Sequence, residues 1–145
     1  MRESDLPDHL RVPDGFALAQ TRGAFSNHNG PLYQASEPKD LRSGMFVLDR
    51  HCNSMGFLHG GMASAYADRA LAVAVWDATK RFSVTLKLTL HFYETVRLHD
   101  WLEVHPNVAS VSNGIVQVHA NLLIDGTKLA ARADATFRSL RRTAK

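Results

Sequence analysis

A short segment of the chain, from Asn53 to Gly61, combines residues that could polarise a carbonyl group. It reads Asn-Ser-Met-Gly-Phe-Leu-His-Gly-Gly, and Asp68 follows seven residues after the second glycine. The Gly-Gly pair begins a stretch without Gly or Pro, which predicts a helix from Gly61 to Thr79. The first amides of a helix have no intrahelical acceptor and lie at the positive end of its dipole. Such a helix start suits a carbonyl oxygen that becomes an oxyanion.

The full spacing, Asn–x5–His–Gly–Gly–x6–Asp, resembles that of the hotdog-fold acyl-CoA thioesterases. It is closest in pattern to the PaaI-like (phenylacetate-pathway) branch of the 4-hydroxybenzoyl-CoA thioesterase superfamily. The resemblance runs from about Gly30 to Leu140 and includes Gly30-Pro31-Leu32-Tyr33 ahead of the motif. It implies hydrolysis of an acyl-CoA thioester to a free carboxylic acid and coenzyme A. It implies no cofactor, because coenzyme A is part of the substrate.

Each polar group of the motif has a chemical role in such a reaction and a plainer structural alternative. The Gly60 N–H, together with Gly61, would polarise the thioester carbonyl, although Gly-Gly also permits a tight turn into a helix. Asp68 would be the general base for water or the attacking carboxylate, or else a polar residue on a helix surface. Asn53 would bind the water, the carbonyl oxygen or its own loop. His59 would orient the carbonyl or bond a backbone group.

Four further residues are candidates for the same site or lie next to it. Thr85 aligns with a position where the family commonly has Ser or Thr near the attacking water, but it lies on the polar face of its predicted strand. Phe57 and Leu58 are expected to bind substrate, although residues of these types would equally serve as core. Cys52 is expected to be a small packed residue, because no base accompanies it at a fixed spacing. No metal site is predicted, since no pair of the eight histidines has ligand spacing within one element.

The separation of Gly60 and Asp68 predicts a dimer. At about 1.5 Å per residue, eight residues place Asp68 about 12 Å along the helix from its start. One carbonyl cannot contact both groups of the same helix. A twofold dimer with facing antiparallel helices would supply the second group and form two equal sites, and the family resemblance implies the same arrangement. We therefore expect a homodimer that pairs further into a dimer of dimers, with Asn53, His59 and Gly60 from one subunit and Asp68 from the other.

Hydrophobic periodicity predicts one long helix followed by a sheet. Along the helix, residues at three-and-four spacing form an amphipathic stripe: Met62, Ala65, Tyr66, Arg69, Ala72, Val73 and Trp76. From Phe82 the period changes to two, and apolar residues from Val84 to Phe92 alternate with polar ones. Residues 23–50 are irregular, with possible strands at Leu32–Ala35 and Met45–Asp49.

The second half of the chain reads as strands joined by tight turns. Asn113-Gly114 and Asp125-Gly126 are strong hairpin signals. They separate strands at about 100–111 and 115–124 from a last strand in which Ala131, Ala133, Ala135 and Phe137 share a face. Four consecutive strands form a predicted antiparallel meander covered by one helix, which is an α+β class. The name hotdog fold, a sheet wrapped around a long central helix, comes from the resemblance.

Composition limits the remaining possibilities. The 145 residues, 45% apolar and with a formal charge of +3, suit one globular domain. We predict a loose lead at 1–14, the domain at 15–140 and a basic tail at 141–145. The N-terminus lacks the apolar run of a secretory signal, and charged residues in the most apolar helix argue against a membrane span, so a cytoplasmic location is expected. Aromatic residues do not alternate with basic ones as on a nucleic-acid surface.

Two other functions are compatible with the motif. One is a non-catalytic acyl-CoA-binding module; the other is a hotdog dehydratase or hydratase, although its proline-rich surroundings of the catalytic His are absent. The acyl group and the choice between coenzyme A and acyl carrier protein stay open. Many relatives have a basic residue for the coenzyme A phosphates directly after the hairpin glycine, where this chain has Ile115. The unranked candidates for that role are Lys80, Arg81, Arg97 and Arg138.

Overall fold

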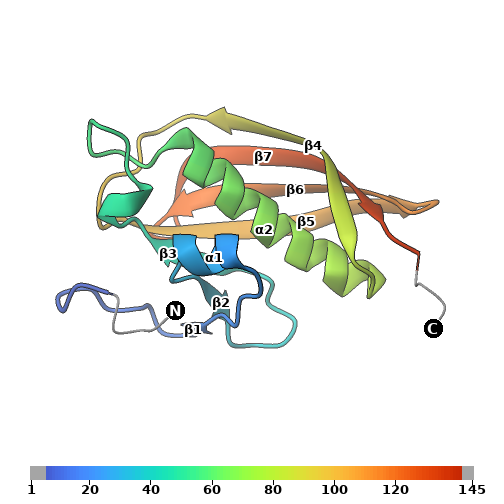
Figure 1. The fold of residues 1–145 in the computed structure, drawn as a ribbon, viewed down its shortest axis with the longest axis horizontal. Helices are drawn as coiled ribbons and strands as arrows, with labels where there is room; N and C mark the ends of the chain where they lie inside the picture. Colours follow the sequence, from blue (N-terminus) through green and yellow to red (C-terminus); the bar gives the residue numbers. More distant parts are fainter. Residues whose placement is uncertain (1–5, 142–145) are drawn as a thin grey trace.

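A computed structural model describes residues 6–141. One long helix, α2, crosses one face of a seven-stranded sheet (Figure 1). All paired strands are antiparallel, in the order β1-β2-β3-β5-β6-β7-β4. This arrangement confirms the predicted α+β hotdog class. The elements are β1 (Phe16–Leu18), α1 (Ala24–Asn29), β2 (Tyr33–Ala35), β3 (Ser43–Phe46), the 3-10 turn η2 (Asp49–His51), α2 (Gly60–Thr79), β4 (Ser83–Phe92), β5 (Trp101–Ser112), β6 (Ile115–Ile124) and β7 (Lys128–Ser139).

Strands β5, β6 and β7 form the predicted meander. Asn113 and Gly114 have φ values of 50° and 76°, and Asp125 and Gly126 have 52° and 71°. Positive φ at both turn residues matches the right-handed twist of the flanking strands. The prediction of a four-stranded meander was wrong, because β4 pairs with β7 and not with β5. Residues 93–100 form a longer connection, which carries the chain from β4 at one edge to β5.

The buried face of α2 differs from the predicted stripe. Tyr66 is the only member of that stripe that is buried. Trp76, at its end, is 44% exposed. Alanines occur all around this helix, so the sequence shows little contrast between faces. The residues packed on the sheet are Ala63, Tyr66, Ala67, Ala70, Leu71, Ala74 and Val75.

A β-bulge divides β4 into two parts with different orientations. The register shifts between Thr85 and Lys87, so that Thr85 lies opposite the buried Phe137. Directly opposed residues share a face of the sheet, and Thr85 therefore points towards α2. Leu88 packs against the core beyond the bulge, whereas Leu86 is 54% exposed. The prediction of one continuous apolar face along β4, with Thr85 on the polar side, was wrong for this reason.

The first fifty residues add elements that periodicity did not predict. Strands β2 and β3 lie close to the predicted ones, but β1 and α1 were not expected. A second apolar cluster of Tyr33, Phe46, Leu48 and Trp101 packs against Leu6, Leu10 and Val12 of the irregular lead. The division into lead, domain and tail stays a prediction, and residues 1–5 and 142–145 lie outside the described part. No helix within residues 6–141 is long and apolar enough to cross a membrane.

Candidate active site

The loop before α2 is held by Asn53. Its Oδ1 accepts hydrogen bonds from the Met55 N–H (3.0 Å) and the Phe57 N–H (3.2 Å). The Asn53 N–H in turn donates to the Phe57 carbonyl at 2.8 Å. These bonds close the compact loop that its residue type allows. The carbonyl oxygen of the side chain is thus occupied by the loop, while the side chain as a whole lines a cavity.

His59 caps α2 and thereby decides which glycine amide is free. Its backbone is extended (φ −65°, ψ 133°), and its Nδ1 accepts a hydrogen bond from the Gly61 N–H at 2.8 Å. The Gly61 amide is therefore occupied. Gly60 is the first residue of the helix, and its N–H has no acceptor among the described residues. Gly60 is the donor that is available to an incoming carbonyl oxygen.

His51 is hydrogen-bonded to the residue that caps α2. No role in the site was predicted for it from the sequence. It is 1% exposed, its Nδ1 accepts from the Leu48 N–H (3.0 Å), and its Nε2 lies 2.7 Å from the Asn29 carbonyl. A ring that accepts at Nδ1 and donates at Nε2 is neutral. Burial lowers the pKa of His51, which also favours the neutral ring. The His51 carbonyl accepts the His59 N–H at 2.8 Å, so His51 connects α1 to the start of α2.

An apolar cavity of about 280 Å³ opens beside the Gly60 amide. Asn53 and Gly60 lie in its wall together with two residues predicted to bind substrate, Phe57 and Leu58. The rest of its wall includes residues of the sheet and of the β4–β5 connection: Phe92, Val96, Leu102, Leu122 and Ala131. Apolar walls with few polar groups at one end suit the acyl part of a thioester.

Asp68 and Thr85 meet between α2 and β4. The Thr85 hydroxyl donates to Asp68 Oδ1 at 2.6 Å. This short bond to a carboxylate fixes one of its oxygens and depends on the β4 bulge, which turns Thr85 towards the helix. Asp68 lines a second cavity of about 340 Å³, between α1, α2 and Leu88. The sequence-predicted residues thus form two separate groups in one chain. Asn53 and Gly60 line the first cavity, with His59 beside them as the helix cap, whereas Asp68 lines the second and is bonded to Thr85.

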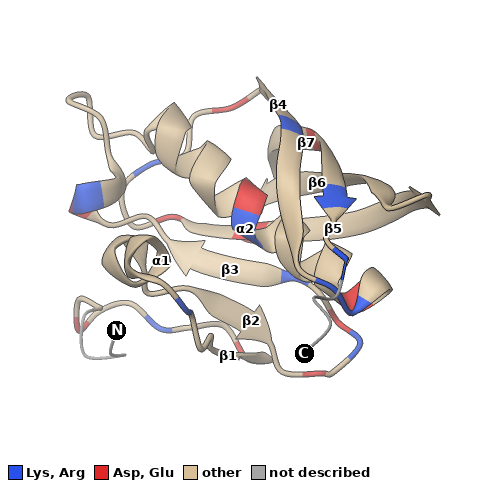
Figure 2. Ribbon diagram, turned by 45° about the vertical axis from the view of Figure 1, so that its right-hand side comes forward, with Lys and Arg blue, Asp and Glu red and all other residues tan. Residues whose placement is uncertain are grey.

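Arg69 lies beside Asp68 in the same cavity. One of its guanidinium nitrogens is buried and has no hydrogen-bond partner within residues 6–141. Burial lowers the pKa of Arg69. Figure 2 shows charged residues near the middle of α2, where the sequence has Asp68 and Arg69 in succession. Half-buried charges on a helix are costly unless partners complete their hydrogen bonds.

Other chemistries have less support in the structure. Burial raises the pKa of the Cys52 thiol, and its Sγ lies 3.5 Å from the Leu48 carbonyl. A raised pKa disfavours the nucleophilic thiolate. Within residues 6–141, no three side chains of His, Cys, Asp or Glu come together as a group that could hold a metal ion.

The sequence of this chain is similar to those of known proteins. Residues 55–131, which are 77 of the 145, match the thioesterase superfamily. The chain is 30% identical over 131 residues to a protein of Pseudomonas aeruginosa named a putative esterase, and the alignment covers 88% of this chain and 97% of that protein.

Solved structures share the fold at lower identity. One is a variant of the phenylacetic acid degradation protein PaaI from Thermus thermophilus, with a TM-score of 0.70, 21% identity and coverage of 80% of this chain and 98% of that one. Another is a Streptococcus mutans protein bound to acetyl-CoA, with a TM-score of 0.67, 17% identity and coverage of 95% and 98%. Together with the extent of the family match, the identity to the Pseudomonas protein shows that the chain belongs to the thioesterase superfamily.

Proposed function

We propose that this protein hydrolyses acyl-CoA thioesters at a site shared between two subunits. The observation that carries the proposal is the free Gly60 N–H at the wall of an apolar cavity, in a chain of the thioesterase superfamily. The amide suits the oxyanion of acyl transfer, and the cavity suits an acyl group. Coenzyme A as the carrier is supported by the Streptococcus mutans protein of the same fold, which was solved with acetyl-CoA bound.

The reaction divides its tasks between the two residue groups. The acyl chain lies in the cavity and its carbonyl oxygen accepts the Gly60 N–H. Asp68 of a second subunit either removes a proton from water as the water attacks the carbonyl carbon, or attacks that carbon itself and is later released by water. In both cases the C–S bond breaks and the thiolate of coenzyme A takes up a proton. The Thr85 hydroxyl holds Asp68 Oδ1, which leaves Oδ2 for the reaction.

The exposed side of α2 and the edge of the sheet favour such a dimer. Strand β4 is the last strand of its sheet, so the backbone groups of its outer edge are unpaired in a single chain. Large apolar side chains around it are exposed: Trp76 (44%), Phe82 (71%), Val84 (44%) and Leu86 (54%). Such a patch is typical of an interface. A partner over α2 would also reach the buried Arg69 nitrogen that has no partner within the described chain.

A thiol-release assay with a panel of aryl, short-chain and medium-chain acyl-CoAs tests the proposal. Wild-type protein should release coenzyme A from at least one class. Asp68→Asn keeps the shape and the Thr85 contact but removes the carboxylate, and should lower kcat by about two orders of magnitude or more.

Asp77→Asn is the matched control, because Asp77 lies near the other end of α2 and pairs with Lys80. It should leave kcat unchanged. Full activity of Asp68→Asn would remove Asp68 from the mechanism. Binding of acyl-CoA by wild-type protein with no release of thiol from any member of the panel would instead favour the non-catalytic module.

A further inference from the structure

The rim of the cavity beside Gly60 is built by two chain segments that include Phe57 and Arg97. Phe57 and Arg97 form an isolated antiparallel bridge. The Leu58 N–H donates to the Val96 carbonyl at 2.8 Å, and the Leu98 N–H donates to the Gly56 carbonyl at 3.3 Å. These bonds fix the backbone of Arg97 against the same loop that carries Asn53.

The Arg97 side chain lies over the ring of Phe57, itself part of the cavity wall. Its guanidinium carbon is 5.4 Å from the ring centroid, a cation–π distance. The side chain is exposed, and its guanidinium has no hydrogen-bond acceptor among residues 6–141. Its hydrogen bonds to the described residues are made by the backbone: the N–H donates to Asp100 Oδ2 at 2.8 Å and the carbonyl accepts the Asp100 N–H at 3.0 Å. Arg97 therefore presents a cation at the rim that lies over Phe57 and has no ion-pair partner among the described residues.

Two other charged residues on this rim, Glu94 and Lys128, neutralise each other. Glu94 lines the cavity and accepts a salt bridge from Lys128 at 3.2 Å. The Lys128 ammonium also lowers the pKa of Glu94, so this carboxylate is ionised at neutral pH. The Glu94–Lys128 pair contributes no net charge. An anion at the rim would therefore meet the unpaired charge of Arg97.

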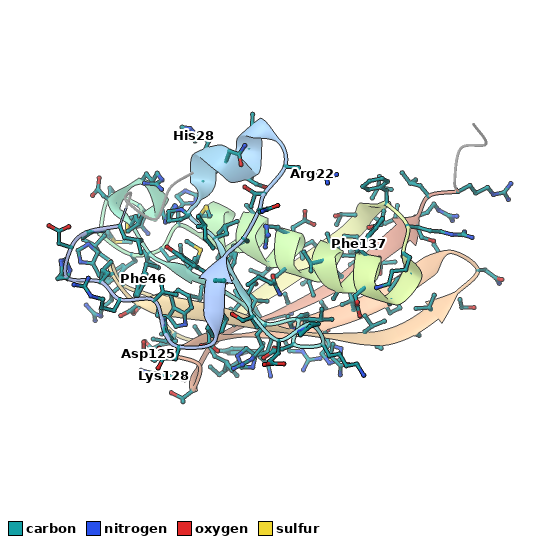
Figure 3. The ribbon with its side chains drawn as sticks, turned by 90° about the horizontal axis from the view of Figure 1, so that it is seen from below. Arg22, His28, Phe46, Asp125, Lys128 and Phe137 are labelled. Carbon is teal, nitrogen blue, oxygen red and sulfur yellow. The ribbon has the colours of Figure 1, made fainter. Side chains whose placement is uncertain are left out.

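The remaining candidate cations lie far from the cavity within one chain. Lys80 and Arg81 follow the end of α2, about 30 Å from Gly60 at 1.5 Å per residue, and Lys80 is paired with Asp77 at 2.8 Å. Arg138 is seven residues along β7 from Ala131 of the cavity wall, about 23 Å away. Figure 3 shows the two ends of β7 well apart, with Lys128 at one and Phe137 towards the other.

We propose that Arg97 binds the phosphate groups of coenzyme A. This assignment rests on the proposed function, which places the thioester at Gly60 and the acyl chain in the cavity. The flexible pantetheine arm then leaves the cavity across its rim, past Phe57. A guanidinium offers a planar fork of donors that matches two phosphate oxygens. Stacking on Phe57 orients this fork before the ligand arrives, which reduces the entropy lost on binding.

The test compares two substrates that differ only in the phosphates. The first is the acyl-CoA that the wild-type protein hydrolyses best, and the second is the same acyl group on pantetheine, which has the arm but no nucleotide. Arg97→Leu should raise the KM for acyl-CoA about tenfold and leave the KM for acyl-pantetheine within about twofold. The kcat for both should be unchanged, because Arg97 does not touch the reacting atoms. Arg97→Lys should lie between wild type and Arg97→Leu, because it keeps the charge but loses the fork.

Arg81→Leu is the matched control, since it removes the same charge from the far end of α2. It should change neither KM. Three results would overturn the assignment of Arg97: an unchanged KM for acyl-CoA in Arg97→Leu, an equal rise for both substrates, or an equal rise in Arg81→Leu. If the wild-type protein hydrolyses neither substrate, the proposed function fails. Calorimetric titration with coenzyme A and with pantetheine then tests Arg97 alone, and it should show weaker binding of coenzyme A only in Arg97→Leu.

Discussion

Thr85 points towards α2, whereas a regular alternation along β4 would place it on the opposite face of the sheet. Its hydroxyl contacts the carboxylate of Asp68 at 2.6 Å, across seventeen residues of sequence. A fixed carboxylate oxygen would help both proposed roles of Asp68, because a nucleophile and a base each need a defined direction of attack.

Replacing Thr85 tests this contact. Thr85→Val keeps the volume and removes only the hydroxyl, and we expect kcat to fall about tenfold with little change in KM. Thr85→Ser should restore most of the activity. Thr89→Val is the control, because Thr89 lies opposite Asp134 on the outer face of the same sheet. A loss in Thr89→Val equal to that in Thr85→Val would show that the effect belongs to the strand and not to the hydroxyl.

His51 makes a prediction about pH and stability. Burial lowers its folded-state pKa from the ordinary value of 6.5. Between these two pKa values the unfolded chain binds a proton at His51 and the folded protein does not. The stability that His51 contributes is complete above pH 6.5 and is lost as the pH falls from there towards the lowered pKa. The loss approaches about 1.4 kcal/mol per pH unit within this window.

Urea unfolding between pH 8 and pH 5 measures this dependence. The free energy of unfolding of wild-type protein should fall more steeply below pH 6.5 than that of His51→Gln, whose amide does not titrate. His28→Gln, on α1, serves as the exposed control and should follow the wild-type curve. Parallel curves for wild type and His51→Gln would contradict the neutral buried ring.

The motif residues and the supporting residues differ in how far the sequence could predict them. Gly60 and Asp68 were predicted because their types and spacing are chemically unusual in a helix. Neither His51 nor Arg69 was assigned a role, because burial and hydrogen bonding of a single side chain leave no periodic signal. Gly61 was predicted to contact substrate, but the structure shows its amide bonded to His59, a cap that depends on one rotamer.

At the scale of elements, turn chemistry was more informative than apolar periodicity. Both glycine-containing turns lie where the sequence indicated, because few residues accept positive φ. The buried face of α2 was mispredicted because its alanines weaken the contrast between faces. The β4 bulge could not be predicted from the sequence. One extra residue in the strand reverses which side chains face the core, and no particular residue type marks its position. This local irregularity is what turns Thr85 towards Asp68.

Gly44 tests the packing of the second apolar cluster, which surrounds Trp101. A Cβ at this position would lie 2.0 Å from Cζ2 of Trp101, a ring packed between Phe16, Tyr33 and Phe46. We expect Gly44→Ala to lower the free energy of unfolding by about 2 kcal/mol or more. In the background of Trp101→Leu the same change should cost much less, because the clash is gone. Equal costs in the two backgrounds, measured by urea unfolding, would contradict this packing.

At the scale of the whole molecule, the proposed reaction needs a second subunit. Gly60 and Asp68 are separated by eight residues of one helix, about 12 Å, and they line different cavities. The exposed β4 edge and the open face of α2 leave room for a second copy of the chain. The antiparallel sheet and the long helix were predicted from the sequence pattern, but the strand order was not. The eight residues between β4 and β5 are long enough to join either neighbouring or distant strands of a sheet.

Subunit complementation tests the shared site directly. Gly60→Pro removes the N–H at the first helical position, where proline is tolerated, and the extended backbone of His59 suits a following proline. Gly60→Ala, which keeps the N–H and meets Phe92 only at 3.8 Å, is the control and should stay active. Gly60→Pro and Asp68→Asn should each be inactive alone.

Equal amounts of Gly60→Pro and Asp68→Asn protein are then unfolded together, refolded as a mixture and assayed for thiol release. Half of the dimers formed at random are mixed, and each mixed dimer has one site with an intact Gly60 and an intact Asp68. The mixture should therefore recover about a quarter of the wild-type activity. Activity no higher than the mean of the two separate variants would contradict a site built from two subunits.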